Sequence, residues 1–287
     1  MDENIGFIGT GVMGASMAGH LLQAGKKLSV FSRTRAKAEP LLSRGAAWAD
    51  SPAALAKTCD VVFTIVGFPK DVEEVYLGAS GLVANMRPGA LLVDMTTSRP
   101  DLAVRIASAA AEREGQAIDA PVSGGDKGAR EATLTIMVGG GREAFDRALP
   151  LLQIMGKNIV HQGPAGSGQH CKMCNQIAIA CNMIGVCEAM AYARKAGLDP
   201  ENVLKSIGAG AAASWSLSHL APRMLKGDFA PGFYVKHFIK DMSIAAESAD
   251  QMALDTPGLD LALALYRKLA AQGGEDSGTQ ALCKLYA

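Results

Sequence analysis

The first residues that could bind a ligand are three closely spaced glycines near the start of the chain. Gly9, Gly11 and Gly14 form a G-x-G-x-x-G pattern between an apolar, strand-like run and a segment with helical spacing of apolar residues. In this setting the first glycine permits a tight turn, the second lets the backbone approach a pyrophosphate, and the third packs helix on strand. The helix N-terminus, which carries Val12 and Met13, then faces the phosphates. These five residues are predicted to bind a dinucleotide.

A basic residue flanked by two hydroxyls follows the second predicted strand, about 20 residues beyond the glycines, where NAD enzymes place an acidic residue on the ribose hydroxyls. This chain has Ser32, Arg33 and Thr34 there, and no acid. A guanidinium with neighbouring hydroxyls can hold a 2′-phosphate through charge-assisted hydrogen bonds. We therefore predict NADP as the cofactor, with NAD as the second choice. The alternative is that Arg33 is a solvated loop residue.

A loop rich in hydroxyl groups follows a later predicted strand. Residues 94–100 read D-M-T-T-S-R-P, so Thr97 lies at the centre of a cluster that could reach the nicotinamide end of the cofactor. Ser and Thr before Pro also make plain helix caps. Capping alone would explain Ser98, but not the whole cluster.

A second loop has the composition of an anion site. Ser123, Gly124 and Gly125 end the segment D-A-P-V-S-G-G, which follows another predicted strand. A Ser-Gly-Gly turn presents backbone N–H groups and a hydroxyl to an anion. A carboxylate would fit this turn.

The elements that must position these loops alternate in the first half of the chain. Strand-like runs fall at residues 5–8, 28–31, 61–66, 90–93, 117–118, 134–138 and 159–160. Ala-rich segments of helix length separate most of them, such as 35–44 and 102–114. This alternation predicts a parallel doubly wound sheet that binds ligands at the carboxyl ends of its strands.

The second half of the chain has few β-branched runs and no further G-x-G-x-x-G. Helical spacing is found at residues 173–195, 200–207, 216–225, 239–251 and 259–271. The richest cluster of breakers lies at 163–168, so we predict a dinucleotide-binding domain at 1–163 and a helical substrate and oligomerisation domain at 164–287. The expected fold class is α/β, a Rossmann-type sheet followed by an all-α domain with a long interdomain helix.

The composition of the chain limits the classes of binding partner that we expect. Lys and Arg number 28, as do Asp and Glu, so no net field draws the chain to nucleic acid or to an anionic membrane. A small-molecule partner is the better expectation. The first residues lack the basic and long apolar segments of a secretory signal, so we expect a cytoplasmic protein.

The cysteines indicate neither disulfides nor metal. Four of the six crowd into one apolar segment, which is unlike a disulfide framework, and we expect them to be reduced. Cys171 and Cys174 form a C-x-x-C after His170, but no second ligand pair follows at a spacing suitable for zinc. We predict no metal site.

Four motifs stand in order along the chain. They are F-I-G-T-G-V-M-G at 7–14, D-A-P-V-S-G-G at 119–125, G-S-G-Q-H-C-K-M-C-N-Q at 166–176 and K-D-M at 240–242. In order and spacing they resemble the β-hydroxyacid dehydrogenase family, which includes 3-hydroxyisobutyrate dehydrogenases and tartronate and succinic semialdehyde reductases. The third motif is similar to the family's G-x-G-x-x-x-K-x-x-N-[NQ], and the fourth to its K-D-[LM]. The resemblance covers nearly the whole chain.

The resemblance implies roles for individual residues. Ser123, Gly124 and Gly125 would anchor the substrate carboxylate, and Thr97 and Lys240 would contact the cofactor. It also implies a homodimer or homotetramer, and the apolar excess of the helical half is consistent with subunit contacts.

By the same resemblance Lys172 takes the catalytic position, with Asn175 as the polar residue beside it. Hydride transfer to a carbonyl leaves an alkoxide that must be protonated, and a lysine partly buried in a cleft can supply that proton. Lys172 begins a segment that is almost free of charge, and Asn175 follows three residues later on the same helical face. The alternative is a solvated lysine. Many members have a second Asn where this chain has Gln176, which bears on substrate fit more than on the reaction.

The expected activity is NADP-dependent hydride transfer between nicotinamide and a small 3-hydroxy acid or semialdehyde carboxylate. An imine reductase shares the architecture but generally lacks the lysine, and 6-phosphogluconate dehydrogenases need a much longer helical domain. A non-catalytic NADP-binding protein is the alternative from another class. Which acyl group the substrate carries is left open, and use of NADP favours reduction.

Overall fold

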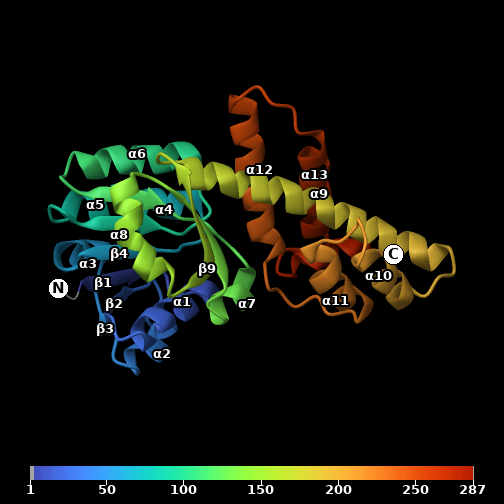
Figure 1. Ribbon diagram of the computed structural model, residues 1–287, viewed down its shortest axis with the longest axis horizontal. Coiled ribbons are helices and arrows are strands. Elements are labelled where there is room, and N and C mark those ends of the chain that lie inside the picture. Colours follow the sequence, from blue (N-terminus) through green and yellow to red (C-terminus); the bar gives the residue numbers. More distant parts are fainter. Residues whose placement is uncertain (1–2, 287) are drawn as a thin grey trace. The chain divides into compact units, whose positions relative to one another are not determined.

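The computed structural model describes residues 3–286, and its internal contacts divide the chain into two compact units between Lys172 and Met173 (Figure 1). The predicted boundary at residues 163 and 164 stays a prediction. It falls just before helix α9 (Ser167–Lys195), whereas the contacts divide the chain within that helix.

The first unit is built on a mostly parallel sheet. Its parallel strands have the order β3-β2-β1-β4-β5-β6. Their bounds are β1 (Asn4–Ile8), β2 (Lys27–Phe31), β3 (Ala47–Trp48), β4 (Val61–Thr64), β5 (Leu91–Asp94) and β6 (Gln116–Asp119). The chain moves outward from β1 on one side and from β4 on the other, which places the topological switch point between these two strands. Ligands of such sheets bind there.

The far edge of the sheet is not purely parallel, which corrects the expectation of a parallel sheet throughout. Strand β8 (Leu134–Gly139) runs antiparallel to β6 and to the short β7 (Val122–Ser123), and β9 (Gly156–Gly163) runs parallel to β8. Because β6 and β7 both run antiparallel to β8, the chain reverses its direction between β7 and β8, in the segment that contains the short helix α7 (Gly125–Arg130).

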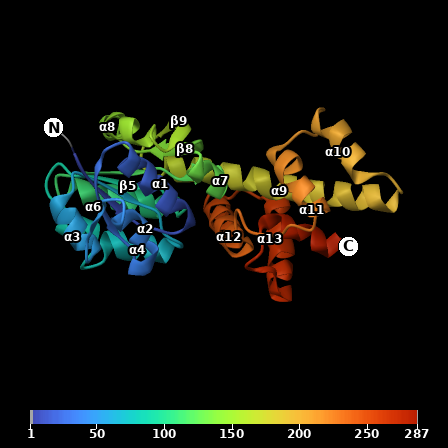
Figure 2. The same ribbon diagram turned by 90° about the horizontal axis from the view of Figure 1, so that it is seen from below.

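Helices cover both faces of this sheet (Figures 1 and 2). One face carries α3 (Pro52–Thr58), α4 (Pro69–Leu77), α5 (Leu82–Asn85) and α6 (Pro100–Ala111), and the other carries α1 (Val12–Gln23), α2 (Glu39–Leu42), α7 (Gly125–Arg130) and α8 (Arg142–Leu152). Side chains alternate along each strand, so Val61 and Phe63 join the core under α1 and α8 while Val62 joins the core under the other layer. A sheet buried on both faces explains the continuous apolar runs in the sequence.

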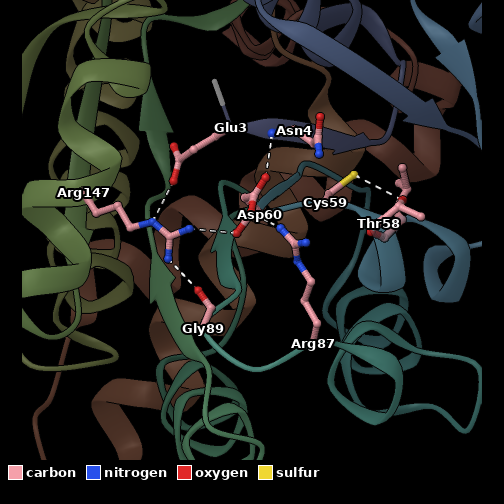
Figure 3. A network of polar contacts seen from close by, with 9 residues as sticks. Glu3, Asn4, Thr58, Cys59, Asp60, Arg87, Gly89 and Arg147 are labelled. Carbon is pink, nitrogen blue, oxygen red and sulfur yellow. Dashed lines mark hydrogen bonds and ion pairs between the residues drawn. The ribbon is translucent and has the colours of Figure 1, made fainter. Parts of the chain in front are cut away.

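The amino ends of the strands are held by one arginine of α8 (Figure 3). Arg147 Nε donates to Glu3 Oε1 at 2.9 Å, and its Nη atoms donate to Gly89 O at 2.7 Å and Asp60 O at 3.2 Å. Asp60 also forms an ion pair with Arg87. Because these residues precede β1, β4 and β5, the network lies at the edge opposite the carboxyl ends and serves stability.

The second unit is helical over its described residues. After α9 come α10 (Pro200–Gly208), a π-helical turn (Ser216–Leu220), α11 (Ala221–Leu225), α12 (Val235–Gln251), α13 (Pro257–Leu269), a second π-helical turn (Ala270–Gly274) and a 3₁₀ helix (Thr279–Tyr286). Phe238 and Tyr266 meet edge to face in its core, with ring centroids 5.0 Å apart. Helix α9 is long and apolar enough to cross a membrane by length and composition, a test that core helices of soluble proteins also pass.

The predicted fold class is confirmed, a mostly parallel sheet with flanking helices followed by a helical part. Two details differ. The predicted helix at 35–44 is a 3₁₀ turn (Arg35–Lys37) and then α2, which begins at Glu39 with Pro40 in its first turn, where a residue without an N–H is tolerated. Helix α9 begins at Ser167 rather than at residue 173, since its first turn crosses the glycine-rich segment.

Candidate active site

The glycine loop between β1 and α1 has the geometry that a dinucleotide requires. Gly9 has φ of 97°, and a Cβ there would lie 2.0 Å from Ile65 O. A Cβ on Gly14 would lie 1.9 Å from Gly9 O, so only glycine lets α1 approach the turn this closely. Gly11 is different, because a Cβ on it would meet nothing within 4 Å. Its backbone faces open space at the helix start, where a pyrophosphate can approach.

A threonine inside this loop adds a polar group that the motif did not single out. Thr10 is buried, and its Oγ1 has no hydrogen-bond partner among residues 3–286. An unsatisfied buried hydroxyl is costly unless a ligand or water completes it. Together with Val12 and Met13, which open α1, the loop fits a bound dinucleotide.

Arg33 lies just beyond β2, with Ser32 half-buried and Thr34 exposed on either side. Its side chain is 75% exposed, but one Nη donates to Asp71 Oδ1 at 2.9 Å. Asp71 is only 8% exposed, and its second oxygen accepts from Phe68 N at the start of α4. The guanidinium is therefore held at one end by a fixed carboxylate while most of it faces solvent. Asp71 was not predicted from the sequence, since it lies in the first turn of α4, far from Arg33 along the chain.

The hydroxyl-rich loop after β5 is held by its own polar groups. Thr96 N donates to Asp94 Oδ1 at 3.0 Å, and Thr96 Oγ1 accepts from Val66 N at 3.0 Å. Thr97 follows and is half-buried. Ser98 does not cap α6: the N-cap residue is Arg99, without a side-chain cap, and Ser98 Oγ is buried without a partner among the described residues. The capping explanation for Ser98 is therefore wrong.

Lys172 is a buried residue, with 6% of its surface exposed. Its Nζ donates to Val122 O at 2.9 Å. Val122 directly precedes Ser123 at the end of β7, and Gly124 and Gly125 follow with φ of 128° and 63°. The first unit thus brings the predicted catalytic ammonium beside the predicted carboxylate turn. The solvated-lysine alternative does not describe this side chain.

The remaining predicted site residues belong to a buried polar chain in the second unit. Asn175 Nδ2 donates to Gln176 Oε1 at 2.7 Å, and Gln176 Nε2 donates to Asp241 Oδ2 at 2.7 Å. Lys240 Nζ lies 2.8 Å from Asp241 Oδ1. The unit therefore connects Asn175 to Lys240 through Gln176 and Asp241, and the longer arm of Gln176 reaches the carboxylate. Burial and the positive charge of Lys240 lower the pKa of nearby His237.

Potential metal ligands do not gather in the described part of the chain. No group of three or more His, Cys, Asp or Glu side chains that could hold a metal ion occurs between residues 3 and 286. Cys171 is half-buried and Cys174 is exposed, and neither forms a disulfide within the described residues.

Comparison with known proteins accounts for both units. Residues 4–163 match the family described as the NAD binding domain of 6-phosphogluconate dehydrogenase. Residues 166–286 match the family described as the NAD-binding domain of NADP-dependent 3-hydroxyisobutyrate dehydrogenase. The chain belongs to the 3-hydroxyisobutyrate dehydrogenase family. This confirms the resemblance on which the sequence argument depended.

Relatives and solved structures agree with this membership. "Uncharacterized oxidoreductase YkwC" of Bacillus subtilis (strain 168) is 62% identical over 286 residues, which are 100% of this chain and 99% of that protein. The 2-hydroxy-3-oxopropionate reductase of Escherichia coli (strain K12) is 40% identical over 97% of this chain and 95% of its own. The Mycobacterium tuberculosis 3-hydroxyisobutyrate dehydrogenase, solved with L-serine, matches with a TM-score of 0.91 at 32% identity over 99% of each chain.

Two further structures bear on cofactor and on alternatives. Psf3, solved with NADP⁺ and 2-OPP, has a TM-score of 0.91 at 27% identity, covering 99% of this chain and 100% of that chain. An imine reductase from Myxococcus stipitatus has a TM-score of 0.66 at 18% identity over 100% of each chain, which shows a shared fold alone. The protein is therefore an oxidoreductase, a hydroxyacid dehydrogenase of this family that binds NAD(P).

Proposed function

We propose that this family member transfers a hydride between NADP and a small 3-hydroxy acid or the corresponding semialdehyde, with Lys172 as the general acid and base. The observation that carries the proposal is the position of one buried ammonium. Lys172 Nζ is held 2.9 Å from Val122 O, immediately before the Ser123–Gly124–Gly125 turn. A substrate whose carboxylate binds that turn would present its neighbouring carbons to the lysine.

A dinucleotide held by the loop of Gly9, Gly11 and Gly14 would supply or accept the hydride at its nicotinamide ring. Lys172 handles the proton: its ammonium donates to the oxygen that becomes the alcohol during reduction, and its neutral amine accepts that proton during oxidation. The side chain is only 6% exposed, so bulk water does not compete for the proton. Asn175, three residues along α9, is proposed as the polar residue that orients the same substrate oxygen.

The proposed carboxylate site is the turn that follows β7. Ser123 supplies a hydroxyl, and the positive φ angles of Gly124 and Gly125 make a turn whose N–H groups are available to an anion. Names of relatives support a small carboxylate. The Escherichia coli relative is named for 2-hydroxy-3-oxopropionate, and the Mycobacterium tuberculosis structure contains L-serine, itself a 3-hydroxy acid.

The preference for NADP is proposed from Arg33. Asp71 holds one side of its guanidinium, while the exposed remainder, with Ser32 and Thr34, can bind a 2′-phosphate. The description of the second family as NADP-dependent, and the NADP⁺ in the Psf3 structure, support the same choice. Thr97 and Lys240 are proposed as further cofactor contacts. We also propose a homodimer or homotetramer in the cytoplasm, with no nucleic-acid or membrane partner.

A substrate panel with both cofactors tests the proposal. Oxidation of NADPH is followed with the semialdehydes of methylmalonate, tartronate and succinate, and reduction of NADP⁺ with 3-hydroxyisobutyrate and L-serine. Lys172→Met should lower kcat by about 10²-fold to 10⁴-fold, the usual contribution of a positioned acid, and leave NADPH affinity close to wild type. NADPH binding without turnover of any substrate, or a normal kcat in Lys172→Met, would overturn it.

A further inference from the structure

The carboxyl ends of four neighbouring strands of the first unit lie at one level. Ile8 pairs with Thr64, Thr64 with Asp94, and Asp94 with Asp119 in the parallel ladders. The last residues of β1, β4, β5 and β6 therefore form a row. The glycine loop, the hydroxyl-rich loop and the start of α9 are attached along this row, so the way in which they are joined decides their relative positions.

Gln169 joins two of these ends with its side chain and its backbone. The side chain is fully buried, and both ends of its amide are used by the loop after β5. Its Nε2 donates to Thr96 O at 2.7 Å, and its Oε1 accepts from Ser98 N at 2.9 Å. Its backbone N–H donates to Asp119 Oδ2, at the end of β6, at 2.7 Å. One residue therefore holds the backbone on both sides of Thr97 and also contacts the neighbouring strand end.

Asp119 fixes the beginning of the helix that carries Gln169. Its other oxygen, Oδ1, accepts from Gly166 N at 2.7 Å, so the buried carboxylate binds two N–H groups at the start of α9. These groups have no partner within the helix. A Cβ on Gly168 would lie 2.4 Å from Met137 O, so glycine at this position lets the helix start lie directly against the strands. The first turn of α9 is thus attached to the sheet.

The connection continues toward the glycine loop. Thr96 Oγ1 accepts from Val66 N, just beyond β4, at 3.0 Å. The backbone next to Val66 is the one that Gly9 approaches, since a Cβ on Gly9 would collide with Ile65 O. A continuous set of contacts therefore runs from the dinucleotide loop through the Thr96 loop to Gln169. Lys172 lies three residues beyond Gln169 on the same helix, close to one turn away.

We infer that Gln169 is a positioning residue that sets the Thr97 loop and the helix of Lys172 in one register, aligning the proton donor with the bound cofactor. The inference rests on the proposed role of Lys172. Gln169 itself touches neither substrate nor reacting atoms; it acts through the backbone of residues 96–98 and through the first turn of α9. Without its amide, the buried Ser98 N–H and Thr96 C=O lose their partners, and the loop must move to satisfy them.

Two variants separate the contacts of this amide. Gln169→Leu removes both side-chain hydrogen bonds at similar size. Gln169→Glu keeps an acceptor for Ser98 N–H but replaces the donor to Thr96 O with a second oxygen, and it carries the test if the leucine variant does not fold. The matched control is Gln280→Leu, because Gln280 is also buried and its amide also makes two hydrogen bonds to the backbone, donating to the carbonyls of Asp228 and Ala230, outside the proposed site.

The measurements are NADPH affinity by fluorescence without substrate, kcat and KM, and the solvent deuterium isotope effect on kcat. A displacement of about 1 Å can lower a rate by about 10²-fold, and a fall of this order is expected in kcat for Gln169→Leu. NADPH should bind several-fold more weakly, KM for the carboxylate should change little, and the isotope effect should rise because proton donation becomes slower. Gln169→Glu should lie between Gln169→Leu and wild type.

A purely structural role would reduce the amount of active enzyme and leave these quantities unchanged. Wild-type NADPH affinity and isotope effect in both Gln169 variants, or the same changes in Gln280→Leu, would overturn the inference. Lys172→Met in the same assays distinguishes failure of the proposed function from failure of the positioning role of Gln169. A normal kcat in that variant removes the proposed function, whereas an inactive Lys172→Met beside wild-type-like Gln169 variants removes only the positioning role.

Discussion

The buried carboxylate at the start of α9 leads to a prediction about stability and pH. Asp119 is nearly inaccessible to solvent, and burial raises its pKa from 3.8 to about 6, although the backbone N–H groups of Gly166 and Gln169 act in the opposite direction. Asp119→Asn keeps the size of the side chain and removes its titration. We therefore compare the pH dependence of unfolding in the wild type and in this variant.

The direction in which the free energy of unfolding changes with pH follows from proton binding. Between pH 3.8 and about 6 the folded carboxyl holds a proton that the unfolded carboxyl has lost, so the free energy of unfolding falls as pH rises through this window. One pKa unit corresponds to about 1.4 kcal/mol, so a change from 3.8 to about 6 corresponds to about 3 kcal/mol. The Asp119→Asn variant lacks this pH-dependent contribution to the free energy of unfolding. The wild type should therefore lose about 2 kcal/mol relative to the variant between pH 4 and pH 7, because part of the full change falls below pH 4.

The two tryptophans of the chain allow the first unit to be followed separately. Trp48 lies in β3, and Trp215, in the second unit, is 56% exposed and can be replaced by Phe. Urea unfolding in the Trp215→Phe background is then read from Trp48 fluorescence at several pH values. Comparing differences between the two proteins cancels the titration of other groups. Parallel curves for wild type and Asp119→Asn across this window would refute the dominance of burial at Asp119.

Two further predictions concern cofactor choice and the amino edge of the sheet. Arg33→Ala should weaken NADPH binding by about 10-fold to 100-fold, the value of one or two charge-assisted hydrogen bonds, and should change the affinity for NADH by no more than about 2-fold. Arg35→Ala, a neighbouring change, is the control. Equal losses of affinity for both cofactors would contradict the assignment of Arg33 to the 2′-phosphate. Arg147→Leu should lower the free energy of unfolding by about 1–3 kcal/mol and leave kcat/KM unchanged, because the three hydrogen bonds of Arg147 lie away from the carboxyl ends of the strands. The control is Arg142→Leu, which removes an exposed ion pair on the same helix and should change the free energy of unfolding by under about 1 kcal/mol. Equal effects of the two substitutions would count against the Arg147 network.

Much of the fold was accessible from local pattern. Mostly apolar runs of four or more residues predicted β1, β2, β4, β5 and β8 within about two residues, because strands buried on both faces need a largely apolar sequence. Strands β3 and β7 have two residues each, which is too short for any periodicity to be visible. The antiparallel direction of β8 was also missed. Strand direction depends on the path of the connection, which apolar pattern does not describe.

In the candidate site, too, local features were predicted from the sequence and long-range contacts were not. The glycine loop was recognised because its requirements are local: the φ of Gly9 and the close approach of Gly14 concern consecutive residues of one turn. Ser123 and Lys172 were found from motifs on separate segments, but their proximity came only with the structure, through Val122 O. Asp71 was not foreseen at all, since an aspartate at a helix start has an ordinary capping role.

By itself, the sequence determined the kinds of elements, the tight glycine turn after β1 and the chemical types at the proposed site, because these follow from the conformational limits of neighbouring residues. Only the tertiary structure decided which distant groups meet. Arg33 and Asp71 are 38 positions apart, Asp119 and the Gln169 N–H are 50, and Gln169 and Thr96 O are 73. Such pairings depend on sheet order and on the level at which strands end, and neither property is encoded in any single segment.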